Sequence, residues 1–335
     1  MAVKKRILTG DRPTGKLHLG HYVGSLINRV KLQDEYDTFV IIADMQALTT
    51  NFKQPEKLGQ DIREVAMDYM AVGIDPEKAT IFIQSYIPEI AELTMYYSMF
   101  TTVNTLRHNP TVKTEAKERG YQEMMYGFLG YPVSQAADIS IFKAHLVPVG
   151  QDQVPHIELT RKIVRQFNEL YKPVLIEPDA LISEVPRLIG LDGGSKMSKS
   201  LNNAIYLSDK EEVIGKQIRT AVTDPARIHP TDPGHPEICT IYAYHNVFNK
   251  EFVPEVTVLC REGKIGCVAC KSKLTKVLNA FLVPIREKRK ELEAKPALLD
   301  EILIEGTKKA HKVAKLTMEE VRDVMGLNYF KKQGN

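Results

Sequence analysis

The chain contains 335 residues, of which 43% are hydrophobic and 26% are charged, and at about 100–200 residues per domain this length predicts two domains. The longest uncharged runs, residues 93–106 and 124–137, carry polar side chains and are shorter than the ~20 apolar residues that a membrane-spanning helix needs. The formal net charge of +3 is too small to indicate a nucleic-acid-binding protein by itself. Only Ile7 and Leu8 follow the basic residues 4–6 before the chain turns polar, so we expect no secretory signal and a cytoplasmic enzyme.

The first part of the chain alternates between short apolar runs and amphipathic segments. Continuous apolar runs such as residues 38–43 are typical of buried parallel strands. In chain order, the pattern predicts a strand over 4–9, a helix over 17–32, a strand over 38–43, a helix over 55–72 closed by Gly73, a strand over 79–84, a helix over 89–102, a strand over 146–149, a helix from Asp152, which can cap it, to about Leu170, and a strand over 173–176. This alternation predicts an α/β fold with a Rossmann-type, doubly wound parallel sheet. Ligands bind such sheets at the carboxyl ends of the strands, so we expect the chemistry in the turns after Thr9, Ala43 and Val149.

Beyond Leu201 the periodicity is helical only. Residues 223–236 contain four prolines and are typical of a linker. Further helices are predicted over residues 272–293, 300–316 and 317–325. Residues 271–290 are strongly basic, with Glu287 as their one acid, which suits either a polyanionic partner or a solvated helix face. We therefore predict a catalytic α/β domain over residues 1–203 and an all-helical domain over residues 204–330.

Two histidines three residues apart begin the first predicted helix. His18 and His21 share one helix face at this spacing, so both imidazoles can point at one ligand. Gly20 between them removes a side chain where a flat base could pack, and a helix N-terminus favours phosphate. A glycine turn with two surface histidines is the alternative.

A second motif, Gly-Gly-Ser-Lys-Met-Ser-Lys-Ser, occupies residues 193–200. Two lysines three apart on a Gly/Ser loop suit a mobile clamp on phosphates, because lysine supplies a point charge and the glycines let the loop close. Taken alone, such a loop is most often a linker.

Together and in this order, His-Leu-Gly-His and Lys-Met-Ser-Lys-Ser resemble the two signature motifs of the class I aminoacyl-tRNA synthetases. Tyr-Pro-Val-Ser-Gln-Ala-Ala-Asp-Ile at 131–139 and Val-Pro-Val-Gly-Gln-Asp-Gln at 147–153 are similar to the bacterial tryptophanyl-tRNA synthetases. The similarity runs from Ile7 to about Leu327. It implies a homodimeric ligase without a membrane segment, which activates L-tryptophan with ATP and Mg²⁺ and transfers it to tRNA(Trp), with an anticodon-binding helical domain. The tyrosine enzyme, which shares the fold and both motifs, is the alternative.

The resemblance also implies how tryptophan is recognised. In the family, an aspartate matching Asp138 accepts a hydrogen bond from the indole N–H, which can only donate. A buried carboxylate without a partner is costly, so phenylalanine, which would leave it unpaired, is rejected. The other residues placed around tryptophan are Leu8 as a pocket wall, Gln135 on the indole wall, and Tyr131 and Gln153 at the ammonium end. A helix-face carboxylate in a salt bridge is the alternative role of Asp138.

The resemblance places ATP between the two motifs, with its adenosine against the first motif and its phosphates against the second. The residues that the resemblance places around ATP are Arg12, Pro13, Thr14, Gly20, His21, Gly150, Gln151, Asp152, Leu188, Lys196, Met197, Ser198, Lys199 and Ser200. The residues expected to act in catalysis are His18, His21, Lys113, Lys196 and Lys199, although Lys113 could also be an ordinary exposed lysine. The lysines stabilise charge on the leaving pyrophosphate, Mg²⁺ is held mainly by phosphates and water, and no protein nucleophile is required.

Two residues depart from the pattern of many family members. Arg12 stands where many carry Gln, which changes the charge on the phosphate side, and Gln135 stands where many carry Met, which changes the indole wall.

Two other functions also fit parts of the pattern. A nucleotidyltransferase on the same fold would not need the basic helical C-terminus, and a non-enzymatic RNA-binding paralogue would not need both motifs intact.

All four cysteines lie within a short stretch, as Cys239, Cys260, Cys267 and Cys270. In a chain without a predicted signal sequence, such clustering favours metal ligation over disulfides. Four thiolates suit a zinc ion or a [4Fe–4S] cluster equally by ligand count, although zinc sites usually use two Cys-x-x-Cys pairs and only one is present. The spacing resembles that of some tryptophanyl-tRNA synthetases with a [4Fe–4S] cluster in the anticodon domain. We therefore expect a structural cluster, with zinc or free buried thiols as alternatives.

Overall fold

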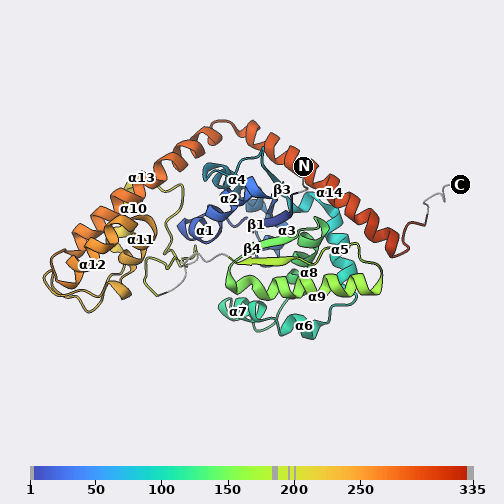
Figure 1. Ribbon diagram of the computed structural model, residues 1–335, viewed down its shortest axis with the longest axis horizontal. Coiled ribbons are helices and arrows are strands. Elements are labelled where there is room, and N and C mark those ends of the chain that lie inside the picture. The colour runs from blue at the N-terminus through green and yellow to red at the C-terminus, as the bar shows by residue number, and fades with distance from the viewer. Residues whose placement is uncertain (1–3, 183–187, 195–196, 200, 330–335) are drawn as a thin grey trace.

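The computed structural model describes residues 4–182, 188–194, 197–199 and 201–329. Among these residues, five parallel strands form one sheet in the order β3-β2-β1-β4-β5 (Figure 1). The strands are β1 (Arg6–Asp11), β2 (Asp37–Ile42), β3 (Ala79–Ile83), β4 (Leu146–Val149) and β5 (Asp179–Ile182). The chain builds the sheet outward from β1 in both directions, so the predicted Rossmann-type, doubly wound fold is confirmed, with its switch point between β1 and β4.

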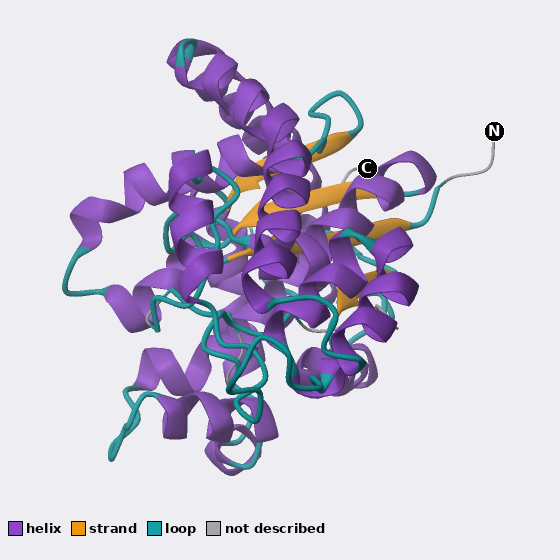
Figure 2. Ribbon diagram, turned by 90° about the vertical axis from the view of Figure 1, so that its left-hand side faces the viewer, coloured by secondary structure: helices purple, strands orange, loops and turns teal. Residues whose placement is uncertain are grey.

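Helices cover both faces of this sheet (Figure 2). In β2, Phe39 and Ile41 point into one hydrophobic core, while Val40 and Ile42 point into the other, as alternation along a strand requires. The helices of the sheet region are α1 (Leu19–His21), which continues through a π-helical turn at Tyr22–Leu26 into α2 (Ile27–Glu35), α3 (Asp44–Asn51), α4 (Leu58–Ala71), α5 (Pro88–Ser98), α6 (Val103–Arg107), α7 (Pro110–Glu118), α8 (Tyr126–Ile141) and α9 (Val154–Leu170).

The remaining helices lie beyond residue 204. They are α10 (Glu211–Thr220), α11 (Thr240–Phe248), α12 (Val253–Arg261), α13 (Cys267–Glu293) and α14 (Pro296–Val324). The predicted helices over 300–316 and 317–325 are therefore one helix. Within the part of the chain that the structure describes, no helix combines the length and the apolar character needed to cross a bilayer.

The last helix, α14, returns to the sheet and covers its β3 edge (Figure 1). A Cβ added to Gly306 would lie 2.0 Å from the carbonyl oxygen of Ile81, so the two backbones touch at a point where only glycine fits. Beside it, the hydroxyl of Thr307 accepts the N–H of Ile83 at 3.2 Å. Helix α14 thus satisfies part of an otherwise open sheet edge, and the sheet and the C-terminal helices share their cores.

The fifth strand lies at Asp179–Ile182, so the prediction of a strand over residues 173–176 was wrong. The reason is a side chain that takes the place of a neighbouring strand. Asn168 Nδ2 donates to the carbonyl of Leu175 at 2.8 Å, and Asn168 Oδ1 accepts the N–H of Leu175 at 3.2 Å. Leu175 is buried for this reason without joining the sheet.

Other boundaries also differ from the predictions. Asp152 does not cap α9, since it lies in a short 3-10 turn at Gln151–Gln153, and the N-cap position belongs to Gln153. The most important omission is α8, which no periodic pattern predicted. It is buried along most of its length and contains Pro132, so it shows neither a polar face nor an uninterrupted helical sequence.

Candidate functional site

The first motif forms a turn between β1 and α1 in which the two histidines meet. His18 has extended backbone angles at the N-cap of α1, and its ring centroid lies 3.8 Å from that of His21. The N–H of His18 donates to Nδ1 of His21 at 3.2 Å. A Cβ at Gly20 would lie 2.9 Å from the His18 ring, so this glycine leaves the space that the ring occupies.

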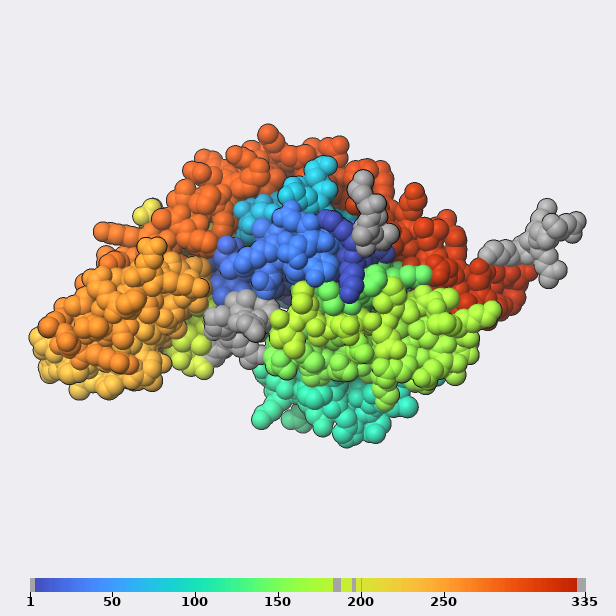
Figure 3. Space-filling model, in the orientation of Figure 1, coloured from blue at the N-terminus to red at the C-terminus, as the bar shows by residue number. Residues whose placement is uncertain are grey.

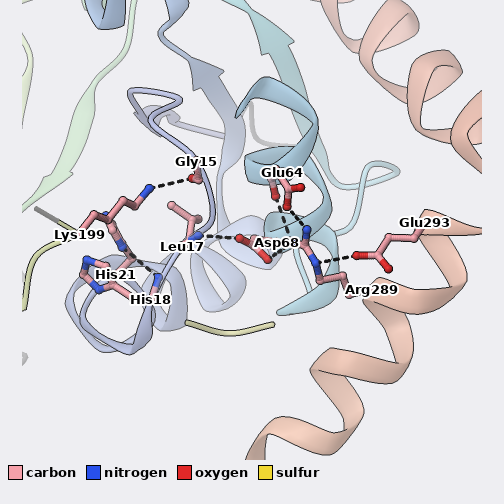
Figure 4. Close-up of polar contacts among 9 residues, drawn as sticks. All are labelled: Gly15, Leu17, His18, His21, Glu64, Asp68, Lys199, Arg289 and Glu293. Atoms are coloured by element: carbon pink, nitrogen blue, oxygen red, sulfur yellow. Dashed lines mark hydrogen bonds and ion pairs between the residues drawn. The ribbon is translucent and has the colours of Figure 1, made fainter. Parts of the chain in front are cut away.

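The second motif packs on the first (Figure 4). The N–H of Gly20 donates to Sδ of Met197 at 3.3 Å, and Lys199 Nζ donates to the carbonyl oxygens of Gly15 at 2.8 Å and Thr14 at 3.1 Å. Burial lowers the pKa of Lys199, while nearby carboxylates act in the opposite direction. Two motifs far apart in sequence therefore meet, and a half-buried ammonium lies beside the turn. Lys196 and Ser200 lie outside the described residues, and the N–H of Ser198 donates to Asn203 Oδ1 at 2.7 Å.

Helix α7 brings charged residues to the rim of the same region. Arg12, which follows β1, pairs with Glu115 at 2.8 Å, and Lys113 is exposed on the same helix. The hydroxyl of Thr111 donates to the carbonyl of Asp152 at 2.9 Å, so α7 also contacts the turn after β4. Because α7 contacts both turns, the residues expected around ATP on the turn after β1 lie near those on the turn after β4. These residues are Arg12, Pro13, Thr14, Gly150, Gln151 and Asp152. Leu188, the remaining one, is buried.

Asp138 lies in α8 and is buried, with two amide partners. Its Oδ1 accepts from Gln84 Nε2 at 2.7 Å, and its Oδ2 accepts from Gln46 Nε2. Burial raises the pKa of Asp138 to about 7, although both amides favour the charged form. Each amide satisfies one oxygen, and each carboxylate oxygen can accept a second hydrogen bond. The alternative role, a helix-face carboxylate in a salt bridge, was wrong, because the partners of Asp138 are two amides.

Sequence reasoning missed Gln46 and Gln84. Gln84 follows β3 directly, and Gln46 lies at the start of α3, just after β2. A signal was present, because polar residues directly after buried parallel strands gather at the carboxyl edge of the sheet. Only their convergence on Asp138 required the structure.

The other residues expected around tryptophan lie on the same elements. Leu8 is buried in β1, and the hydroxyl of Tyr131, in α8, lies 3.0 Å from Nε2 of His156 in α9. Gln135 is half-buried in α8, and Gln153 is half-buried at the start of α9. Helices α8 and α9 pack on each other, so the geometry keeps these residues in one region.

The four cysteines come from three neighbouring helices. Cys239 precedes α11, Cys260 lies in α12, and Cys267 and Cys270 begin α13. All are half-buried and free of disulfides. Burial, together with the charges of the other three thiols, raises the pKa of Cys270 to about 12.

Other polar groups contact these thiols. Nη1 of Arg227 lies 3.9 Å from the sulfurs of both Cys260 and Cys267, and Nε2 of His245 lies 3.5 Å from that of Cys270. Among the described residues, no group of three or more His, Cys, Asp or Glu side chains is arranged in a way that could hold a metal ion. The cysteines therefore lie in one region, but their side chains are not arranged as the ligands of a metal ion.

Comparison with known proteins places these features in context. Residues 2–283 match the family model described as class I tRNA synthetases (W and Y). The chain is 51% identical to the tryptophan--tRNA ligase of Clostridium longisporum, over 98% of each chain. It is 50% identical to the enzyme of the same name from Lactococcus lactis, over 98% of this chain and 99% of the other.

Solved structures agree with these matches. The tryptophanyl-tRNA synthetase of Campylobacter jejuni, complexed with ADP and tryptophan, superposes with a TM-score of 0.86 at 34% identity, over 96% of this chain and 100% of the other. The tyrosyl-tRNA synthetase of Archaeoglobus fulgidus superposes with a TM-score of 0.67 at 22% identity, over 86% of this chain and 91% of the other. At that identity the second likeness shows the fold alone.

Proposed function

The chain belongs to the class I tRNA synthetases for tryptophan and tyrosine, and on this premise we propose that its site ligates L-tryptophan to tRNA(Trp). The tryptophan carboxylate attacks the α-phosphate of ATP and expels pyrophosphate, which leaves tryptophanyl-adenylate. A terminal ribose hydroxyl of the tRNA then takes the acyl group and releases AMP. Because neither step needs a protein nucleophile, the residues act by positioning and by stabilising charge.

The observation that carries this function is identity of about 50% to tryptophan--tRNA ligases over almost the whole chain. The buried carboxyl group of Asp138 offers an acceptor for the indole N–H. The phenol of tyrosine could also donate to it, so the choice of tryptophan over tyrosine rests on the identity to the tryptophan--tRNA ligases. The resemblance to the tyrosine enzyme at 22% identity supports only the shared fold.

The roles of the individual residues follow from this proposal. Lys199 and the histidines of the first motif act on the phosphates, together with Lys113 and with Lys196, which lies outside the described residues. Mg²⁺ arrives with ATP and stays bound mainly to phosphate oxygens and water. The remaining contacts to ATP come from the turns after β1 and β4, from Leu188, and from residues 197–200.

Tryptophan-dependent ATP–pyrophosphate exchange tests the proposed function. We expect exchange with tryptophan and background exchange with tyrosine and each other standard amino acid. The charging of tRNA(Trp) transcripts in the same preparation checks the second step. Preferred exchange with tyrosine would overturn the substrate assignment, while exchange without transfer to any tRNA would favour a different adenylating enzyme.

The assembly and the place of action belong to the same proposal. We propose a homodimer, since apolar side chains are exposed on α5 (Met95), directly after it (Met99), on α6 (Val103) and at the start of α8 (Tyr126). Such side chains on neighbouring helices suit an interface between copies of the chain.

We expect the protein to act in the cytoplasm. We also propose that residues 1–203 carry the catalytic site and that residues 204–330 bind the anticodon.

We also propose that the four cysteines hold a [4Fe–4S] cluster, with zinc as the alternative. The support is the donor set, which consists of half-buried thiols from three helices with the guanidinium of Arg227 beside two of them. Each iron of such a cluster would take one thiolate, and these four cysteines would supply the four. The cluster would hold α11, α12 and the start of α13 together.

Anaerobic purification decides between these occupants. We expect a brown protein with about four irons per chain, and a lower melting temperature for Cys270→Ser with unchanged tryptophan activation. Thr275→Ser, five residues further along α13, is the matched control and should keep the iron. A colourless preparation with one zinc per chain would replace the cluster by zinc, and metal-free protein would leave only free thiols.

A further inference from the structure

A buried ion pair with two further, more exposed carboxylates around it lies outside the residues assigned to the substrates. Arg289 of α13 forms ion pairs with Asp68 and Glu64 of α4, and its Nε pairs with Glu293 Oε1 at 3.1 Å (Figure 4). The side chains of Arg289 and Asp68 are 3% and 0% exposed. Burying charges is costly even when they are paired, and hydrophobic residues could have filled this space.

Asp68 extends this cluster to the first motif. Its Oδ2 accepts the N–H of Leu17 at 2.7 Å, and Leu17 directly precedes His18. The carbonyl of Leu17 accepts the N–H of Leu207 at 3.0 Å. Leu17 is itself buried. Its N–H and its carbonyl are therefore satisfied by protein groups rather than by water, and of these two partners only Asp68 is charged.

Lys199 holds the other end of the same turn. Its ammonium donates to the carbonyl oxygens of Thr14 and Gly15, and Gly15 has a φ of +100°, a conformation that other residues rarely adopt. The turn between β1 and α1 is thus fixed at one end by the proposed phosphate lysine and at the other by Asp68. Movement at Leu17 would displace the carbonyls that orient Lys199.

We propose that Asp68 and Arg289 are positioning residues of the adenylate-forming site, which hold the turn before His18 in the geometry that Lys199 needs. Asp68 holds the turn through the N–H of Leu17, and Arg289 holds Asp68. Neither residue is among those assigned to tryptophan or ATP. The inference rests on the proposed function, because it assigns both residues to the first of its two reactions.

The position of Arg289 adds a link to the helical region. Helix α13 begins at Cys267, beside the cysteine region, and at 1.5 Å per residue its path from there to Arg289 measures about 33 Å. Figure 3 shows the N-terminal segment in blue between the helical region on the left and the green part of the catalytic region. The ion pair of Arg289 with Asp68 therefore connects the turn before His18 to the helix that begins beside the cysteines.

The test measures exchange kinetics and stability on the full chain. For Arg289→Gln and Asp68→Asn, we expect kcat of tryptophan-dependent pyrophosphate exchange, normalised to titrated active sites, to fall on the order of 10–100-fold, as small misplacements do. KM for tryptophan should stay within about twofold, because Asp138 lies elsewhere in the site. Arg289→Lys keeps a charge opposite Asp68 but cannot satisfy all three carboxylates, so it should recover kcat while its melting temperature stays low.

Arg322→Gln is the matched control. Arg322 of α14 pairs with Glu92 of α5, which is also an ion pair between a C-terminal helix and the catalytic region, but it does not contact the turn. It should lower the melting temperature and leave kcat per active site unchanged. The proposal is overturned if Asp68→Asn and Arg289→Gln behave like this control, and Asp68→Asn decides if Arg289→Gln does not fold. If the parent protein fails to exchange with tryptophan, the proposed function fails independently of the variants.

Discussion

Lys199→Ala is expected to lower kcat for tryptophanyl-adenylate formation by about 10²–10³-fold, the usual loss when one positioned donor to a developing charge is removed. Lys199 is half-buried and carries its ammonium beside Thr14 and Gly15. When ATP is activated, negative charge develops on the leaving pyrophosphate, and a fixed cation there stabilises the transition state more than the ground state. KM for tryptophan should therefore change little.

Single-turnover formation of the adenylate measures this effect without product release. Lys210→Ala is the control, since Lys210 is exposed at the start of α10 and lies outside the second motif. If both kcat and KM for ATP are unchanged in Lys199→Ala, residues 193–200 act only as a linker. A rise of about 10²–10³-fold in KM for ATP with an unchanged kcat would assign Lys199 to ground-state binding instead.

Asp138→Ala is expected to lower kcat/KM for tryptophan by about 30–1000-fold, which corresponds to the roughly 2–4 kcal/mol lost when a buried, charged hydrogen-bond partner is removed. The variant removes the acceptor for the indole N–H. It also leaves the buried amide groups of Gln46 and Gln84 without the oxygens to which they donate. The loss of both partnerships places the expected effect well above that of an exposed carboxylate.

A selectivity measurement separates recognition from general damage. The benzothiophene analogue of tryptophan keeps the shape of the indole but has no N–H, so the parent should discriminate against it and Asp138→Ala should not. Asp34→Ala removes an exposed carboxylate that pairs with Lys78 and should leave the discrimination unchanged. If Asp138→Ala discriminates as strongly as the parent, the carboxyl group does not read the N–H.

Much of the fold and of the candidate site could be predicted from the sequence because the deciding features are local. Residues 38–43 are continuously apolar, which is what a strand buried on both faces requires, and β2 occupies Asp37–Ile42. Gly73, predicted to close a helix, has a φ of +106°. The histidine and lysine motifs each lie within a short segment, and it was their occurrence together and in this order that indicated the chemistry.

Helix α8 and strand β5 show where local patterns fail. Burial on most sides removed the amphipathic period of α8, and Pro132 argued against a helix although neighbouring helices enclose it. The apolar residues near Leu175 looked like a strand, but Asn168 satisfies that backbone. In both places the environment, which lies far away in sequence, decided the structure.

The fold class and the type of chemistry could be predicted from the sequence, because strands, helices and each of the two motifs are encoded in residues that are close together along the chain. Which polar groups are partners depends on how the elements pack. Asp138 meets Gln46 and Gln84, and Asp68 meets Arg289, across long stretches of sequence. Such pairs leave no local signature, because a hydrogen bond or an ion pair depends on distances of a few ångströms that only the packing of the helices on the sheet creates.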